Sequence, residues 1–250
     1  MKKLLTLLLI AFVAINFIAC SSDDDEGPTG TTTYKVSGTI TDADGNGVAN
    51  QTVEAKSADD TKTTTTDAQG AYVFTGLTAG TTYTITANGT DYYFTTTGTG
   101  QVTLNADATV NFTAVGLYGT WVSEGANVAP LLVALFATAK IEATFNQNGS
   151  YTVVQTDTSG ASFTLTGTFT MTKSTVNNIF EITAEQTSPA ALTSSGIFEI
   201  YADSSPFNMK YEIVQTTPDI GATPPTPAGG FGSTNAGALG TLNVQTYVRQ

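Results

Sequence analysis

Two short acidic stretches are the first candidates for chemistry in this sequence. One reads TDADGNG at residues 41–47, and an echo, TDAQG, follows further along the chain. The first places Asp42, Asp44 and an Asn at alternating positions, as the first half of an EF-hand calcium loop does, but the Glu required at the twelfth position is replaced by Val53. Both stretches are therefore predicted to be turns whose Asp side chains cap backbone N–H groups, with no metal. A weak calcium site shared with Asp67 stays open as the alternative.

The side chains that most hydrolases use are absent or committed elsewhere. The chain has no His, and its one Cys is Cys20, at the end of the N-terminal apolar run. Acid–base chemistry would therefore rest on carboxylates, Lys or Tyr. Five Glu residues lie on or beside predicted strands and are expected to face solvent: Glu142, Glu181, Glu185, Glu199 and Glu212. No pair of them stands out for glycoside hydrolysis, although such a pair stays open. We expect no enzyme, no catalytic residue and no cofactor.

Apolar side chains share one face of several predicted strands in the second half of the chain. They make four of these side chains candidates for lining a pocket: Phe163, Phe169, Phe198 and Tyr211. A fifth candidate, Phe231, lies between glycines in a long segment at residues 216–240, and can close over the mouth of such a pocket. The same side chains can instead fill the interior completely, and this alternative stays open.

The N-terminus has the organisation of a secretory signal. Two Lys residues precede an apolar run over residues 4–18, which is too short to span a bilayer comfortably. The run ends in Ala-Cys at Cys20, and this ending resembles the lipobox of bacterial lipoproteins. The resemblance implies cleavage before Cys20 and acyl chains on this residue, so residues 1–19 are expected to be a signal peptide. A soluble secreted protein is the alternative.

A flexible tether is expected over residues 20–32. It contains an acidic run of four residues: Asp23, Asp24, Asp25 and Glu26. Such a run cannot bury apolar surface and favours a solvated spacer. An acidic run directly after a lipidated Cys also resembles the surface-export signal of lipoproteins from the Bacteroidota. This resemblance implies a lipid-anchored protein of the outer membrane, exposed at the cell surface; a plain spacer and the inner face of that membrane stay open.

Seven short strand signals with turns between them predict a β-sandwich over residues 33–115. A resemblance to the carboxypeptidase regulatory-like domain, a prealbumin-like sandwich, rests on the following residues: Val36, Gly38, Ile40, Asp42, Gly45, Val53, Thr66, Asp67, Gly70, Tyr72, Phe74, Leu77, Gly80 and Tyr83. The resemblance implies a non-catalytic scaffold of a kind that often lies at the base of surface proteins.

Eight successive strand signals, with one apolar helix over residues 127–139, predict an up-and-down barrel over residues 116–250. The G-x-W at Trp121 and the Arg249 near the C-terminus make this part similar to lipocalin-like domains. In that family the Arg packs across the Trp and closes the barrel floor, so the resemblance implies this role for the pair. The whole chain is thus expected to be all-β, with a seven-stranded prealbumin-like or Ig-like sandwich followed by an eight-stranded lipocalin-like barrel.

Composition narrows the range of partners. The formal net charge is −12 and only 12% of residues are charged, so a phosphate backbone would be repelled and no nucleic-acid partner is expected. We expect a non-catalytic binding module, tethered to a membrane by its lipid, that holds a small apolar molecule in the barrel. A structural or adhesive surface protein that binds glycan or protein through its loops, without an internal pocket, is the alternative.

Overall fold

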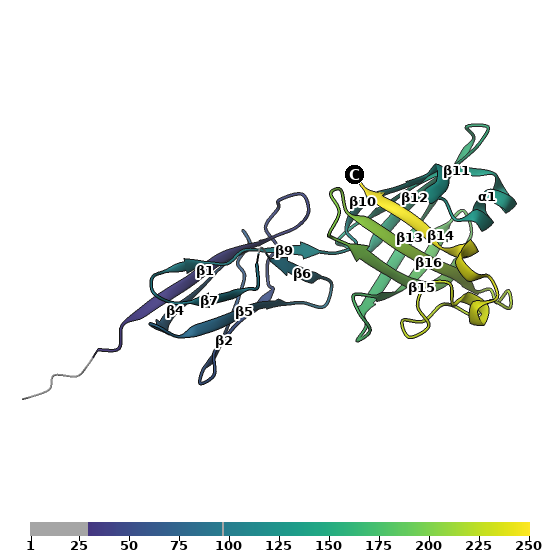
Figure 1. The fold of residues 1–250 in the computed structure, drawn as a ribbon. Coiled ribbons are helices and arrows are strands. Elements are labelled where there is room, and N and C mark those ends of the chain that lie inside the picture. The colour runs from purple at the N-terminus through teal and green to yellow at the C-terminus, as the bar shows by residue number, and fades with distance from the viewer. Residues whose placement is uncertain (1–29, 97) are drawn as a thin grey trace, which may run out of the picture. The chain divides into compact units, whose positions relative to one another are not determined.

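Apolar side chains in this protein gather into two clusters, one centred in each predicted domain. The computed structural model describes residues 30–96 and 98–250 (Figure 1). The predictions for the signal peptide, for Cys20 and for the acidic run at Asp23–Glu26 lie outside the described residues. The first cluster is built from residues such as Val36, Phe74 and Ile85, and the second from residues such as Trp121 and Phe198.

The first domain consists of two sheets. One has the strand order β4-β1-β9-β6 with β8 also paired to β1, and the other has the order β3-β2-β5-β7. The strands are β1 (Thr33–Thr41), β2 (Thr52–Lys56), β3 (Thr61–Thr65), β4 (Ala71–Thr78), β5 (Thr82–Asn88), β6 (Tyr93–Thr96), β7 (Gln101–Thr103), β8 (Ala108–Thr109) and β9 (Phe112–Val115). β1 runs antiparallel to β4 and parallel to β8 and β9.

Burial along β1 follows the alternation of its sequence. Val36 and Ile40 are fully buried, whereas Lys35 and Thr39 are exposed. Gly38 lies on the buried face, where a Cβ atom would come within 1.8 Å of the carbonyl oxygen of Val110. Because no side chain fits this close approach of two strands, the glycine is required by packing.

The TDADGNG stretch forms a turn, as predicted. Asp42 Oδ1 accepts the backbone N–H groups of Asp44 and Asn46, both at 2.9 Å, and Gly45 follows with φ of +84°. Asp44 Oδ2 is 2.6 Å from Nη2 of Arg249, so this carboxylate is engaged in an ion pair. The described residues hold no group of three or more His, Cys, Asp or Glu side chains arranged for a metal.

The same turn recurs at Asp67, at the TDAQG echo. Asp67 Oδ1 accepts the backbone N–H groups of Gln69 at 2.9 Å and Ala71 at 2.8 Å, and Gly70 has φ of +74°. The side-chain oxygen satisfies donors that no strand partner reaches, and the glycine adopts a backbone conformation that other residues rarely take. The repeated sequence therefore encodes the same Asp-capped turn at two places in the domain.

A third copy of the turn, at Asp157, leads to a prediction on pH. Asp157 Oδ1 accepts the Ser159 hydroxyl at 2.6 Å and the N–H groups of Ser159 and Ala161, and these bonds lower the pKa of this carboxyl below its usual value. A lowered folded-state pKa stabilises the fold above the unfolded-state pKa, and this contribution is lost as pH falls through the folded-state pKa. NMR titration of the Asp157 carboxyl carbon should give a lower midpoint in the native protein than in the urea-unfolded chain. Equal midpoints would contradict the assignment.

Within the described residues, eight antiparallel strands close into a barrel in their order along the chain. They are β10 (Gly119–Glu124), β11 (Thr138–Phe145), β12 (Ser150–Asp157), β13 (Ser162–Lys173), β14 (Phe180–Ser188), β15 (Leu192–Tyr201), β16 (Asn208–Thr217) and β17 (Gln245–Arg249). Closure is made by β10 and β17, with Trp121 opposite Arg249 and Val122 opposite Val248.

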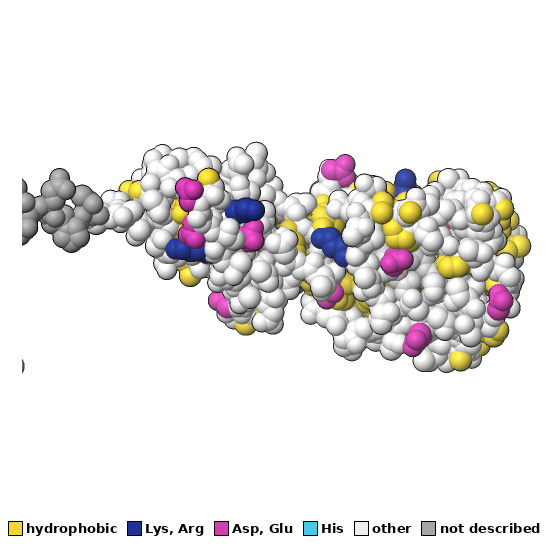
Figure 2. All heavy atoms as spheres, turned by 90° about the horizontal axis from the view of Figure 1, so that it is seen from below, with side chains coloured by type: hydrophobic (Ala, Val, Ile, Leu, Met, Phe, Trp, Pro, Cys, Tyr) yellow, Lys and Arg dark blue, Asp and Glu magenta, His cyan; other side chains and the backbone are white. Residues whose placement is uncertain are grey.

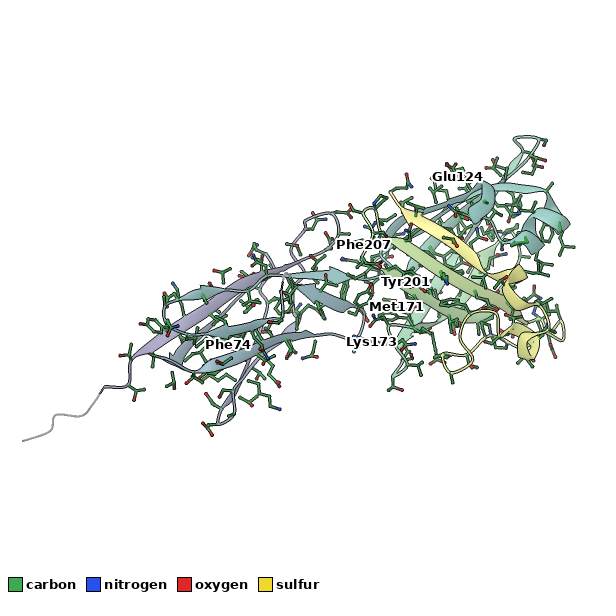
Figure 3. All side chains as sticks on the ribbon, in the orientation of Figure 1. Phe74, Glu124, Met171, Lys173, Tyr201 and Phe207 are labelled. Atoms are coloured by element: carbon green, nitrogen blue, oxygen red, sulfur yellow. The ribbon has the colours of Figure 1, made fainter. Side chains whose placement is uncertain are left out.

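The barrel has two different ends. At the end where β10 begins, which we call the closed end, adjacent strands are joined by short turns; Lys173, Tyr201 and Phe207 lie there (Figure 3). At the other end, which we call the open end, β10 finishes at Glu124 and leads through the 3-10 turn η1 (Gly125–Asn127) to the helix α1 (Pro130–Phe136). The connection between β16 and β17, residues 218–244, also lies at the open end and contains the turns η2 (Thr234–Gly237) and η3 (Gly240–Asn243).

α1 is shorter than the helix predicted over residues 127–139, since it begins at Pro130 and ends at Phe136. Pro130 lies in its first turn, where a missing N–H costs nothing, and Ala137 follows its last residue in the left-handed region with φ of +50°. The N–H of Ala137 donates to the carbonyl of Val133, which completes the last turn. None of the helices in the described part of the chain combines the length and apolar character needed to cross a bilayer.

The predicted all-β fold is confirmed, with a sandwich followed by a closed eight-stranded barrel and a short helix. The first domain has nine strand segments where seven were predicted, because β7 was not predicted and one predicted strand is divided in two. Residues 108–115 form the two segments β8 and β9, because the Asn111 side chain, rather than the backbone alone, pairs with β1: its Oδ1 accepts the N–H of Thr39 at 2.9 Å.

Candidate ligand site in the barrel

Trp121 and Arg249 lie together at the closed end of the barrel. The Arg249 guanidinium carbon is 5.5 Å from the centre of the Trp121 ring, and the indole Nε1 donates to the carbonyl of Leu117 at 2.7 Å. Trp121 is fully buried and Arg249 nearly so, and Nη1 of Arg249 donates to the carbonyl of Tyr118. A cation above an indole ring contributes about 0.5 to 2 kcal/mol, and here it also covers the floor of the barrel.

Aromatic side chains fill the half of the barrel interior next to this floor. The rings of Phe180 and Phe198 stack at 5.0 Å with an interplanar angle of 7°, and both side chains are fully buried. Phe145 and Phe169 meet edge to face at 5.2 Å. These rings leave the closed half as a packed core rather than a binding site.

A cavity of about 120 Å³ remains at the open end. It is lined by residues of α1, of three strands and of the two segments next to these elements: Ala129, Leu132, Ile141, Tyr211, Ile213, Asn243, Gln245 and Tyr247. None of these side chains carries a full charge. The volume is far below the 300–1,000 Å³ of common ligand pockets and close to that of an engineered cavity of about 150 Å³ that takes up benzene.

Two tyrosines form one wall of this cavity. The rings of Tyr211 and Tyr247 meet edge to face at 5.9 Å. Burial raises the pKa of both phenols far above the usual value, and for Tyr211 the neighbouring Tyr247 and Tyr151 add to the effect. Both therefore remain neutral over the whole physiological range, so the wall presents uncharged hydroxyl groups.

Most buried amides near the open end have partners within the protein. Gln155 Nε2 donates to Thr138 Oγ1 at 2.7 Å, and Gln186 Nε2 donates to the carbonyl of Ala190 at 2.8 Å. Gln245 differs: its Oε1 accepts the N–H of Ala129 at 2.8 Å, but its Nε2 is buried without a partner. Ser123 Oγ is likewise buried and unpartnered. Gln245, which lines the cavity, therefore carries a donor that the protein does not use.

The structure distributes the predicted pocket residues over several places. Phe169 and Phe198 belong to the packed core, and Tyr211 lines the cavity. Phe163, on the inward face of β13, reaches the rim of the open end and is 47% exposed. Phe231 lies beyond the wall of the barrel, with its ring centre 5.9 Å from Nζ of Lys210 on β16.

The expectation that Glu212 faces solvent is wrong. Glu212 points outward from β16 but is fully buried, because residues 218–244 fold back over the outer face of the barrel. Its carboxylate accepts the N–H of Gly232 at 2.6 Å and the N–H and hydroxyl of Thr234 at 3.2 and 2.5 Å. We call this set of bonds the Glu212 clasp. It fastens the middle of the long connection to the outside of the wall.

The other Glu residues singled out from sequence lie on the outer face of the barrel. Glu181 and Glu185 are exposed on β14. Glu142 pairs with Lys140 at 3.2 Å, and Glu199 accepts the hydroxyl of Tyr201 at 2.7 Å. They are therefore separated from the interior cavity by the barrel wall.

Large apolar side chains are exposed around the open end. Leu135 and Phe136 of α1 are 64% and 56% exposed, and four more such residues lie in α1, in β13 and in residues 218–244: Val133, Phe163, Ile220 and Leu242. The backbone N–H of Thr158, directly after β12, donates to the carbonyl of Ala137 and links the turn between β12 and β13 to the end of α1. We call the six exposed apolar residues of this end, Val133, Leu135, Phe136, Phe163, Ile220 and Leu242, the apolar rim. On the face of the molecule in Figure 2, charged side chains appear as a few separate groups.

Sequence reasoning missed Gln245 and Ser123. Each points into the barrel at a position where the alternation predicts an apolar side chain. Gln245 lies two residues before Tyr247, and Ser123 lies two residues after Trp121. A polar residue at an inward position of a terminal barrel strand is the signal that would have found them. This signal identifies a binding residue only when it is known which part of the barrel interior is packed and which part is hollow.

Comparison with known protein families agrees with the predicted type of the first domain. The carboxypeptidase regulatory-like domain family matches residues 35–115. Among solved structures, the chain is similar to the Bacillus anthracis TIE protein, with 15% identity and a TM-score of 0.33 over 62% of this chain and 28% of that one. It is also similar to the shaft pilin spaA of Lactobacillus rhamnosus GG, with 12% identity and a TM-score of 0.28 over 66% of this chain and 93% of that one.

The match thus spans little more than a quarter of the Bacillus anthracis protein. No curated protein matches the chain. At these TM-scores the two solved structures carry no argument about function, so the assignment rests on the family match and on the strand topology. The N-terminal part of this chain contains a carboxypeptidase regulatory-like domain, and its C-terminal part is a closed eight-stranded antiparallel barrel.

Proposed function

We propose that this protein is a non-catalytic binding module that holds a small molecule at the open end of its barrel. The observation that carries the proposal is the cavity of about 120 Å³ bordered by Leu132, Tyr211 and Gln245, in a barrel whose other half is tightly packed. A side-chain-filled barrel needs no such space, and a regulatory-like sandwich supplies a non-catalytic support. The size of the cavity favours a ligand much smaller than a fatty acid or a retinoid.

A test of this function uses a set of neutral fragments with about six to nine non-hydrogen atoms. A fragment at a concentration about a hundredfold above its dissociation constant should stabilise the native chain by about 2.7 kcal/mol, which thermal unfolding detects. The variant Ile213→Phe should abolish the shift by filling the cavity, whereas Val73→Phe, at an exposed position of the sandwich, should leave it unchanged. Shifts that survive Ile213→Phe would place binding elsewhere.

The module is proposed to act at the cell surface, anchored in the outer membrane by acyl chains on Cys20. The apolar run before Cys20 and the acidic run at Asp23–Glu26 support this location. Metabolic labelling with a palmitate analogue should mark the wild-type protein and not Cys20→Ala. Equal labelling of the two would refute the anchor. Replacing the acidic run with neutral residues should reduce cleavage by external protease in intact cells, and unchanged cleavage would refute the export role.

A second candidate function, adhesion to a protein or glycan through loops, is favoured by the apolar rim. Exposed apolar side chains gathered at one end of a domain often mark an interaction surface. The double variant Leu135→Ser with Phe136→Ser should then weaken attachment to a protein- or glycan-coated surface without changing fragment binding. The converse result, loss of fragment binding with attachment intact, would favour the cavity.

A further inference from the structure

We propose that the cavity selects an uncharged, compact ligand carrying a hydrogen-bond acceptor, and that the carboxamide nitrogen of Gln245 recognises this acceptor. The inference deepens the proposed function and rests on it. It adds the chemical class of the ligand and the residue that forms a hydrogen bond with it.

The orientation of the Gln245 amide follows from its partner. The backbone nitrogen of Ala129 can only donate, so the Gln245 atom 2.8 Å from it must be the oxygen. The nitrogen, with two hydrogens, therefore occupies the other side of the amide. Gln245 is only 4% exposed, and both it and Ala129 line the cavity, so the unused donor belongs to a side chain of the cavity wall.

A buried donor without a hydrogen bond lowers the stability of the protein, and a ligand that accepts this bond restores the lost free energy. A buried polar group without a partner loses its bonds to water and gains none in return. Gln155 and Gln186, at the same end of the barrel, avoid this loss by bonding to Thr138 and to the carbonyl of Ala190. Among the described residues, Gln245 is the amide of the cavity lining whose buried nitrogen has no partner.

Ser123 provides a second unsatisfied group, on a residue paired with the lining of the cavity. It lies on β10 opposite Ile141, which lines the cavity, and it is fully buried with its hydroxyl unpartnered. A hydroxyl both donates and accepts, so it can complete a pair of bonds with a ligand carbonyl or hydroxyl group. Two buried unsatisfied groups, one on a residue that lines the cavity and one on a residue paired with that lining, are better explained by a shared ligand than by two separate losses.

The remaining lining sets the charge and size of the ligand. Leu132, Ile141 and Ile213 are apolar, and the phenols of Tyr211 and Tyr247 stay neutral. A charged ligand would lose its hydration without gaining a counter-charge, so the site favours a neutral one. A volume of about 120 Å³ accommodates one six-membered ring with a short substituent.

A matched pair of probes tests the acceptor. Acetophenone and α-methylstyrene have nearly the same shape, but only the first has a carbonyl oxygen. Calorimetry or NMR titration of the full chain should show acetophenone binding about tenfold more tightly. Gln245→Met should remove this preference, whereas Gln186→Met, which changes a buried amide bonded outside the cavity, should keep it.

A second measurement avoids dependence on the folding of the Gln245 variant. In the wild-type protein, acetophenone should shift the side-chain amide resonances of Gln245 more than α-methylstyrene does, and Ser123→Ala, which breaks no bond within the protein, should reduce the preference. Equal affinities of the two probes in the wild type, or a preference that survives Gln245→Met, would overturn the inference while leaving a binding cavity. Binding of neither probe, with Ile213→Phe without effect on any fragment, would overturn the proposed function itself.

Discussion

Replacing Phe198 with Ala is expected to lower the free energy of unfolding of the barrel by about 3–5 kcal/mol. Phe198 is fully buried and stacks at 5.0 Å on Phe180 in the packed half of the interior. Its removal leaves a void between strands held by a closed ladder of hydrogen bonds, so the barrel cannot collapse to fill it. Urea unfolding followed by the fluorescence of Trp121, the only Trp in the chain, measures the loss.

Phe163→Ala provides the control for this change. It removes the same group from the same barrel, but the side chain is 47% exposed at the rim. The expected loss is below about 1 kcal/mol, because little apolar surface leaves water there on folding. Equal losses for the two variants would mean that the packed half of the barrel does not carry its stability.

Replacing Glu212 with Gln is expected to cost about 2–3 kcal/mol and to release residues 218–244 from the wall of the barrel. The substitution keeps the shape of the side chain but turns one acceptor into a donor. That donor must then face either the N–H of Gly232 or the N–H and hydroxyl of Thr234. Limited proteolysis should cut within residues 218–244 faster than in the wild type, with the cleavage sites read by mass spectrometry.

The matched control is Glu181→Gln, an exposed carboxylate on the neighbouring part of the outer wall. Its free energy of unfolding should stay within about 0.5 kcal/mol of the wild-type value. Its cleavage rate should equal that of the wild type within experimental error. A cleavage rate unchanged in Glu212→Gln would show that the long connection is held by contacts other than the clasp.

The strand pattern was sufficient for the architecture because most barrel strands have one solvent-exposed and one buried face. Phe180 and Ile182 on β14, or Met209 and Tyr211 on β16, alternate with polar neighbours and define the inward face directly. Sequential antiparallel pairing then follows from the short turns between these strands. Trp121 and Arg249, far apart in the sequence, were brought together by the resemblance to lipocalin-like domains, and the structure places them opposite each other in the closing ladder.

The interior could not be divided into packed and hollow parts from the sequence. Phe198 and Tyr211 are both aromatic residues on inward positions, yet one stacks in the core and the other borders the cavity. The difference arises from their height along the barrel axis and from which side chains face them across the interior. These relations depend on strand tilt and register, and single-strand periodicity does not contain them.

Glu212 shows the same limit on the outer face. Alternation correctly assigns its side chain to the outside of β16, where a carboxylate is normally solvated. Its burial comes from Gly232 and Thr234, which lie about twenty residues further along a segment rich in Gly and Pro. No local pattern in that segment indicates where it folds back, because the information lies in the pairing of its N–H groups with a single distant carboxylate.

The Glu212 clasp also determines where this protein can be lengthened. It divides the connection between β16 and β17 into two spans, residues 218–231 and 235–244, which are joined to each other by the hydrogen bonds between Thr223 and Asn235. An inserted peptide in either span adds loop-closure entropy only to that span, which grows slowly with length, while the fastened residues and the strand register stay in place. The open end of the barrel therefore offers two separately variable display sites on one scaffold, of which one begins beside Ile220 and the other runs past Leu242 into Gln245.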